Sequence, residues 1–250
     1  MIELHLIGIG TGNPDHLTLQ AIKALNAADL VLIPRKGETK ADLAELRRAI
    51  CAEVLTNPAT RIAEFDLPLR DAKNPSYRAG VDDWHDAIAG VWIETILAEI
   101  GHDGRVALLV WGDPSLYDST LRIAGRVGRT LPLAVRVVPG ITSLQTLTAA
   151  HAIPLNELGE PFIVTTGRQL RDHGWPAGVR TVAVMLDGEC SFESVAPEGV
   201  TIWWGAYLGM EDELTLSGPL AETAERIIAT RAAARERHGW IMDIYILRRA

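Results

Sequence analysis

Residues Val106 to Tyr117, with the sequence VALLVWGDPSLY, join a run of six apolar residues to a polar turn. Six apolar residues are enough for a strand that is buried on both faces. The strand must end at Gly112-Asp113-Pro114, because neither strand nor helix interiors tolerate this combination. The residues after Ser119 have helical spacing, so the stretch predicts a strand, a turn and a helix. In open α/β sheets ligands bind at such strand ends; the alternative is that Asp113 only caps the helix.

The same alternation of strand and helix runs from residue 1 to about residue 150. Further strands are expected over residues 4–9, 30–33, 61–66 and 134–138, the third near an edge, with residues 67–81 irregular. Helices are expected over residues 17–28, 41–54 and 82–101. This order predicts a parallel sheet covered by helices on both faces.

The regular alternation of strands and helices ends after about residue 153. Strands are expected over residues 162–166, 179–186, 200–207 and 240–247, with one long helix over 220–238. These strands follow one another too closely for all of them to be parallel. The fold class is therefore α/β with two α/β domains, an N-terminal parallel sheet over residues 1–153 and a C-terminal mixed sheet over residues 154–250.

Composition excludes several classes of protein. The 250 residues carry a formal net charge of −8, which argues against a general nucleic-acid binder. Cys51 and Cys190 are the only cysteines, so a reducing cytoplasm is expected. The sequence shows no signal-peptide pattern and no apolar run near ~20 residues, so no membrane span is expected. It shows no clustered Cys/His set, HExxH motif or EF-hand loop, so no metal is expected.

Two other strand ends carry unusual loops. The first expected strand runs into Gly8, Gly10 and Gly12, which allow a tight turn and a close approach to a ligand. Asn13 excludes the G-x-G-x-x-G dinucleotide fingerprint, and the loop is no Walker A motif. The second expected strand ends in PRKGETK over residues 34–40, a loop that is either solvated or a clamp for substrate carboxylates.

Three motifs together resemble those of the tetrapyrrole methylases. The loop GIGTGNPDHLT over residues 8–18 resembles the opening loop of that family, usually GxGPGDxxLLT. The turn GDPSLY over residues 112–117 resembles its central GDPxxY-type turn, and PGITS over residues 139–143 resembles its PGxxS/T segment. Each motif is weak alone, but the three occur in order, and the similarity covers essentially the whole chain.

The resemblance implies S-adenosylmethionine as methyl donor, bound in a cleft between two α/β domains of a homodimer. Carried over onto this sequence, it implies cofactor contacts from three segments of the first half and two of the second. These are Thr11, Gly112, Asp113, Leu116, Tyr117, Thr142, Ser143, Met185, Gly205, Ala206 and Tyr207. Thr142 or Ser143 could also cap the helix that follows them.

Three departures from the family pattern narrow the resemblance. Thr11 replaces the usual proline, the loop over residues 34–40 is basic, and residues 203–213 replace the usual closing motif of the second domain. These features look most like the branch of aerobic cobalamin biosynthesis that methylates precorrin-5 at C1 with loss of acetate. Such a substrate carries many carboxylates, so a cationic rim is expected. Its candidates are Arg35, Lys36, Lys40, Arg70, Lys73 and Arg78.

Several alternatives stay open. Within the same fold, the acceptor could be another precorrin or uroporphyrinogen position, the protein side chain methylated by diphthine synthase, or ribosomal RNA. Outside it, the chain could be a nucleotide-binding module without catalysis. Release of acetate calls for a general base, for which Asp113 or one of the scattered histidines could serve; the sequence selects none.

Overall fold

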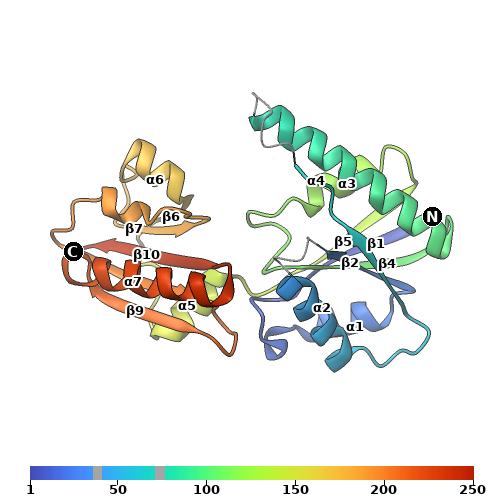
Figure 1. Cartoon of the computed structure of the whole chain (residues 1–250), viewed down its shortest axis with the longest axis horizontal. Coiled ribbons are helices and arrows are strands. Elements are labelled where there is room, and N and C mark those ends of the chain that lie inside the picture. The colour runs from blue at the N-terminus through green and yellow to red at the C-terminus, as the bar shows by residue number, and fades with distance from the viewer. Residues whose placement is uncertain (36–40, 71–76) are drawn as a thin grey trace. The chain divides into compact units, whose positions relative to one another are not determined.

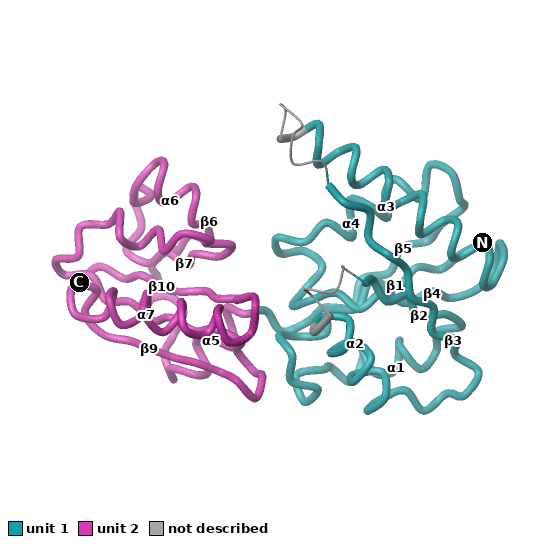
Figure 2. Tube along the Cα trace, in the orientation of Figure 1, with its two compact units in different colours: residues 1–142 teal, residues 143–250 magenta. Residues whose placement is uncertain are grey.

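The structure is a computed structural model that describes residues 1–35, 41–70 and 77–250, with only the backbone for residues 41, 42, 77 and 78. The chain divides into unit 1, residues 1–142, and unit 2, residues 143–250 (Figure 2). Each unit contains its own five-stranded sheet. The sequence predicts the boundary between the two domains near residue 153, where the regular alternation of strands and helices ends. The structure has it earlier because α5 (Ser143–His151) contacts strands of unit 2.

Unit 1 is built on a parallel sheet with the strand order β3-β2-β4-β1-β5 (Figure 1). The expected parallel sheet is confirmed, and β3 lies at its edge as predicted. Because all strands run the same way, the loops after β1, β2 and β4 leave from one edge of the sheet, which we call the carboxyl edge. The strands are β1 (Ile2–Gly8), β2 (Leu30–Arg35), β3 (Arg61–Asp66), β4 (Gly104–Val110) and β5 (Leu133–Val138).

Helices cover both faces of this sheet, as expected. One core packs inward-facing strand residues such as Leu4 and Leu108 against Trp92 of α3 and Ile123 of α4. The other packs the opposite face against α1 and α2. The irregular region predicted up to residue 81 is wrong from residue 77, where α3 already begins. The helices are α1 (Leu19–Asn26), α2 (Ala41–Val54), α3 (Tyr77–Ile100) and α4 (Thr120–Val127), with a short 3-10 helix η1 (Pro14–His16).

Unit 2 contains the expected mixed sheet, in the order β6-β7-β10-β8-β9. The β6–β7 pair is parallel and the other pairs are antiparallel. The strands are β6 (Phe162–Thr166), β7 (Thr181–Met185), β8 (Val200–Ala206), β9 (Leu214–Pro219) and β10 (Asp243–Arg249). Besides α5, the helices are α6 (Gly167–His173), η3 (Ser191–Ser194) and α7 (Leu220–His238). The sequence reasoning missed α6 and β9.

Candidate functional site

The loops after β1 and β4 are joined directly beyond the sheet. Gly8 pairs with Val110 at the end of the two strands, and Gly10 and Gly112 then form an isolated antiparallel bridge. The N–H of Gly112 donates to the carbonyl of Gly10 at 2.8 Å. The GIGTGNPDH loop and the GDPSLY turn therefore form one structure at the carboxyl edge.

The third motif packs onto the same two loops through glycine. A Cβ atom on Gly8 would lie 2.6 Å from the nitrogen of Gly140 and 2.7 Å from the carbonyl oxygen of Gly112. A Cβ atom on Gly140 would lie 2.8 Å from the carbonyl carbon of Gly8 and would also collide with the Gly112 oxygen. Only glycine allows backbones to approach this closely. At Gly8 and Gly140 the close approach is thus to the protein's own backbone.

Asp113 fastens the turn to the third motif. Its Oδ2 accepts a hydrogen bond from the N–H of Gly140 at 2.9 Å. Its Oδ1 accepts from the N–H of Ser115 at 2.8 Å and from the Ser115 hydroxyl at 2.5 Å. Burial raises the pKa of Asp113, but these hydrogen bonds outweigh it and hold the pKa below its ordinary value. The carboxylate bonds within its own turn and across to Gly140 rather than to the backbone of the following helix, so the capping alternative does not account for it.

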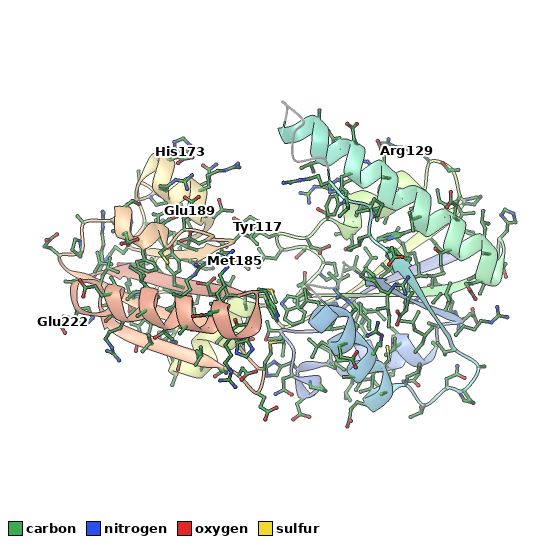
Figure 3. The ribbon with its side chains drawn as sticks, in the orientation of Figure 1. Tyr117, Arg129, His173, Met185, Glu189 and Glu222 are labelled. Carbon is green, nitrogen blue, oxygen red and sulfur yellow. The ribbon has the colours of Figure 1, made fainter. Side chains whose placement is uncertain are left out.

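The other predicted cofactor residues of unit 1 lie in the same loops. Thr11 is buried, and Leu116 closes the turn by donating its N–H to the carbonyl of Asp113 at 3.2 Å. Tyr117 lies on the loop between β4 and α4 (Figure 3), with 44% of its surface exposed. Thr142 ends unit 1, and Ser143 begins α5 in unit 2.

Sequence reasoning missed Arg47, a cation of α2 that bonds to β4 near the same edge. Its Nε donates to the carbonyl of Leu109, near the end of β4, at 3.0 Å, and its Nη1 donates to Leu43. The pairing of β2 with β4 ends at Leu32, so the guanidinium continues the hydrogen bonding of β4 where the neighbouring strand has diverged. Burial lowers the pKa of Arg47 to about 10. No motif identified it, because the contact spans 62 residues.

The predicted cationic rim is only partly described. Arg35 ends β2 and pairs with Asp66 at 2.9 Å and with Glu64 at 3.8 Å, so its charge is compensated. Arg70 is exposed beyond β3. Arg78 lies in the first turn of α3. Lys36, Lys40 and Lys73 lie outside the described residues, so the substrate-binding role of the rim stays a prediction.

In unit 2, Met185 ends β7 (Figure 3). Hydrogen bonds of Asp187 hold the loop that follows. The side chain of Asp187 is buried. It accepts hydrogen bonds from the hydroxyl of Tyr245 at 2.7 Å, from the N–H of Ser191 at 2.6 Å and from the Ser191 hydroxyl at 2.8 Å. Burial raises the pKa of Tyr245, and the neighbouring Asp187 raises it further. Sequence reasoning missed this aspartate, because its partner Tyr245 is 58 residues away in the chain.

A buried ion pair between Arg231 and Asp243 supports the same loop. Arg231 of α7 donates to the Asp187 carbonyl at 2.9 Å and to Asp243 at 3.0 Å. Trp204 also donates to Asp243, at 2.9 Å. Burial raises the pKa of Asp243 although Arg231 lowers it. The buried network thus links the loop after β7 to β8, β10 and α7.

The last three predicted cofactor residues lie at the end of β8, inside unit 2. Gly205 and Ala206 are buried, and a Cβ atom on Gly205 would lie 2.6 Å from Leu208. Tyr207 is 3% exposed, and its hydroxyl donates to the carbonyl of Trp240 at 2.5 Å. Its ring therefore belongs to the core, so only the backbone of Tyr207 could contact a ligand.

Backbone strain coincides with three of the predicted segments. Of the five non-glycine residues with positive φ in the described part of the chain, Tyr117 (49°), Leu186 (53°) and Tyr207 (51°) lie in or directly after a predicted cofactor segment. Such residues cost energy and concentrate at ligand sites. Leu186, which follows Met185, is also 66% exposed.

No group of three or more His, Cys, Asp or Glu side chains in the described part of the chain could hold a metal ion. No helix there is long and apolar enough to cross a membrane.

Comparison with known proteins identifies the family. The family model of the Tetrapyrrole (Corrin/Porphyrin) Methylases matches residues 3–224. A precorrin-6A synthase [deacetylating] of Sinorhizobium sp is 51% identical over all of this chain and 96% of its own length. A precorrin-2 C(20)-methyltransferase of the same source is 31% identical over 65% of the chain and 64% of its own length.

Solved structures agree. A cobalamin-synthesis-related protein (CobF) of Corynebacterium diphtheriae has a TM-score of 0.85 and 40% identity, covering 100% of this chain and 99% of its own. A uroporphyrin-III C-methyltransferase of Thermus thermophilus, solved with S-adenyl homocysteine, has the same fold with a TM-score of 0.60 and 20% identity, covering 98% of this chain and 96% of its own. The chain therefore belongs to the tetrapyrrole (corrin/porphyrin) methylases.

Proposed function

We propose that this chain transfers a methyl group from S-adenosylmethionine to C1 of precorrin-5, with loss of acetate, to give precorrin-6A in aerobic cobalamin biosynthesis. The observation that carries this proposal is the 51% identity to a deacetylating precorrin-6A synthase over the full chain. The other precorrin methylase among the relatives described is 31% identical over 65% of the chain. The proposed localisation is the cytoplasm, and the proposed assembly is a homodimer.

The carboxyl edge of unit 1 fits a methyl donor. Bound S-adenosylmethionine supplies an electrophilic methyl group, so the protein has to align donor and acceptor rather than provide a strong acid. Alignment of this kind is worth roughly 7–11 kcal/mol. The bridge between Gly10 and Gly112 and the hydrogen bonds of Asp113 fix the backbone that would hold the donor. Met185, Gly205, Ala206 and Tyr207 stay predicted cofactor contacts in unit 2.

The proposed substrate is an acidic tetrapyrrole, and its carboxylates need cations. Arg35, Lys36, Lys40, Arg70 and Arg78 are the proposed contacts. Since Arg35 already pairs with Asp66, a substrate carboxylate would have to compete with that side chain. We therefore expect a smaller contribution from Arg35 than its place at the end of β2 would suggest.

The reaction is tested by incubating the purified chain with precorrin-5 and S-adenosylmethionine carrying a labelled methyl group. Mass spectrometry is then used to follow both the methylated product and free acetate. We expect one acetate for each methyl group transferred. Methylation without acetate would favour another precorrin or uroporphyrinogen position. Cofactor binding without turnover on any tetrapyrrole would favour a binding module.

Cofactor binding at the turn is tested with Asp113→Ala. The variant removes the acceptor for Gly140 and Ser115, so the turn should loosen. We expect the affinity for S-adenosylhomocysteine, measured by titration calorimetry, to fall at least about tenfold, which corresponds to about 1.4 kcal/mol. Asp103→Ala is the control, because Asp103 pairs with the N-terminal amine away from the carboxyl edge. Unchanged affinity in Asp113→Ala would remove this residue from the site.

A further inference from the structure

We propose that His16 is the general base that activates water for release of the acetyl group. The inference rests on the proposed function and deepens it, because neither the motifs nor the comparisons assign a base. Three observations support it: His16 lies at the carboxyl edge, its Nδ1 has no partner among the described residues, and hydrogen bonds already occupy the carboxylate of Asp113.

His16 is held rigidly against the joined loops. It ends η1, whose turn is closed by hydrogen bonds from the His16 N–H to Asn13 at 3.0 Å and from the Leu17 N–H to Pro14 at 3.0 Å. A Cβ atom on Gly10 would lie 2.9 Å from the Cβ of His16. Gly10 is thus glycine partly because His16 packs there, and Gly10 is bridged to Gly112, next to Asp113. The imidazole is fixed beside the loops that carry the predicted cofactor contacts.

The ring nitrogens of His16 are not engaged within the protein. Nδ1 is buried, and no described residue offers it a hydrogen bond. The side chain as a whole is only half-buried. Buried polar atoms are nearly always paired in folded proteins, so an exception calls for an explanation. A side chain that packs beside these loops, with a ring nitrogen that has no partner among the described residues, is a candidate for proton transfer, for which histidine is the side chain used most often.

The ring nitrogens of His5 and His85 also have no hydrogen-bond partner among the described residues, so the position of each histidine decides between them. His5 lies within β1, His85 in the middle of α3, and His102 in the turn at the opposite edge of the sheet. In unit 2, His151 bonds to the Trp204 carbonyl and His238 lies 3.8 Å from Asp212. His173 ends α6. His16 is the histidine that follows a strand at the carboxyl edge of unit 1.

Asp113 is the other titratable candidate, and its bonding argues against it. Three hydrogen bonds already occupy its carboxylate and favour the ionised form. A carboxylate stabilised in this way is a weak base. The role of Asp113 is to hold the turn, so another group has to accept the proton of the attacking water.

The proposed step balances as follows. A water oxygen adds to the acetyl carbonyl carbon while His16 accepts one of its protons. The bond between that carbon and C1 of the tetrapyrrole then breaks, and its electron pair stays on C1. The acetyl group leaves as acetic acid, which ionises to acetate, and His16 passes its proton to solvent. C1 now carries the electron pair that forms the new bond to the methyl group.

The test compares His16→Gln with the matched variant His102→Gln. Glutamine keeps polarity and approximate size but cannot act as a base. We expect acetate release by His16→Gln to fall at least about 100-fold, with the affinity for S-adenosylhomocysteine changed less than twofold. His102→Gln should release acetate at the wild-type rate. A second variant, His16→Ala, should regain acetate release on addition of imidazole, which a purely structural role would not allow.

Each outcome has a definite meaning. Acetate release by His16→Gln at the wild-type rate would overturn the proposal. A parallel loss of S-adenosylhomocysteine affinity, without rescue of His16→Ala by imidazole, would also overturn it and make His16 a structural part of the loop. If the wild-type chain itself releases no acetate from precorrin-5, the proposed function fails instead, whatever His16 does.

Discussion

The two units present their predicted site residues by different physical means. In unit 1 the carboxyl edge is held by backbone, through the Gly10–Gly112 bridge and the packing of Gly8 against Gly140. In unit 2 the loop after Met185 is held by buried side chains, above all Asp187 and Arg231. The first arrangement leaves no room for a single added carbon atom. The second depends on charges and hydrogen bonds, so it should respond to the loss of one polar group.

The largest expected effect is at Gly140. In Gly140→Ala the new methyl group would collide with the backbone of Gly8 and Gly112, and backbone cannot move aside as a flexible side chain can. We expect a loss of about 3 kcal/mol or more in the free energy of unfolding, measured by urea denaturation, and loss of S-adenosylhomocysteine binding.

Gly125→Ala is the matched control for that experiment. Gly125 lies within α4, and a Cβ atom there would meet nothing within 4 Å. Alanine in a helix interior is favoured over glycine by about 1 kcal/mol, so this variant should be more stable than the wild type. If both alanine variants behaved alike, the close approach of backbones would not be what unit 1 depends on.

An intermediate effect is expected for the network of unit 2. Tyr245→Phe removes a hydrogen bond to the buried carboxylate of Asp187, whereas Tyr207→Phe removes one to the carbonyl of Trp240. Hydrogen bonds to charged groups contribute about 1.5–3 kcal/mol and neutral ones about 0.5–1.5 kcal/mol. Urea denaturation should therefore show the larger loss for Tyr245→Phe. The reverse order would mean that Asp187 does not hold this loop.

The smallest effect is a dependence on pH at Asp113. Its pKa in the folded state lies below the ordinary value, so the ionised carboxylate stabilises the fold at neutral pH. This stabilisation is lost as the pH falls below about 4 and through the folded-state pKa. Asp113→Asn should be less stable than the wild type by about 1 kcal/mol at pH 7. Urea midpoints between pH 7 and pH 3 should converge; a constant difference would contradict the assignment.

Most of the fold could be predicted from periodicity, because β2 and β4 contain apolar runs bounded by turn residues and helices with an apolar face alternate with the strands of unit 1. The bounds of α2, β3, β6 and α7 agree with the prediction. The start of α3 at Tyr77 could not be predicted, since Pro75 and Asn74 indicate a loop. β9 was missed because Gly218 and Pro219 weaken its strand pattern.

The candidate site divides in the same way. Asp113 and its neighbours could be found because they form a local motif. Arg47 and Asp187 could not, because each acts through partners more distant in the chain: Leu109 for the first, Tyr245 and Arg231 for the second. Local sequence predicts which turn contributes to the site, and only the folded chain shows which buried side chains support that turn.

The position of β1 between β4 and β5 has a consequence for synthesis on the ribosome. β1 precedes both of its neighbours, β4 and β5, in the chain, and Ile2 pairs with Gly104 and Leu133. Pairing over so many residues is slow, and an unpaired apolar strand is prone to aggregate. During synthesis the apolar residues of β1 therefore have no strand partner until Val110, the last residue of β4, has emerged.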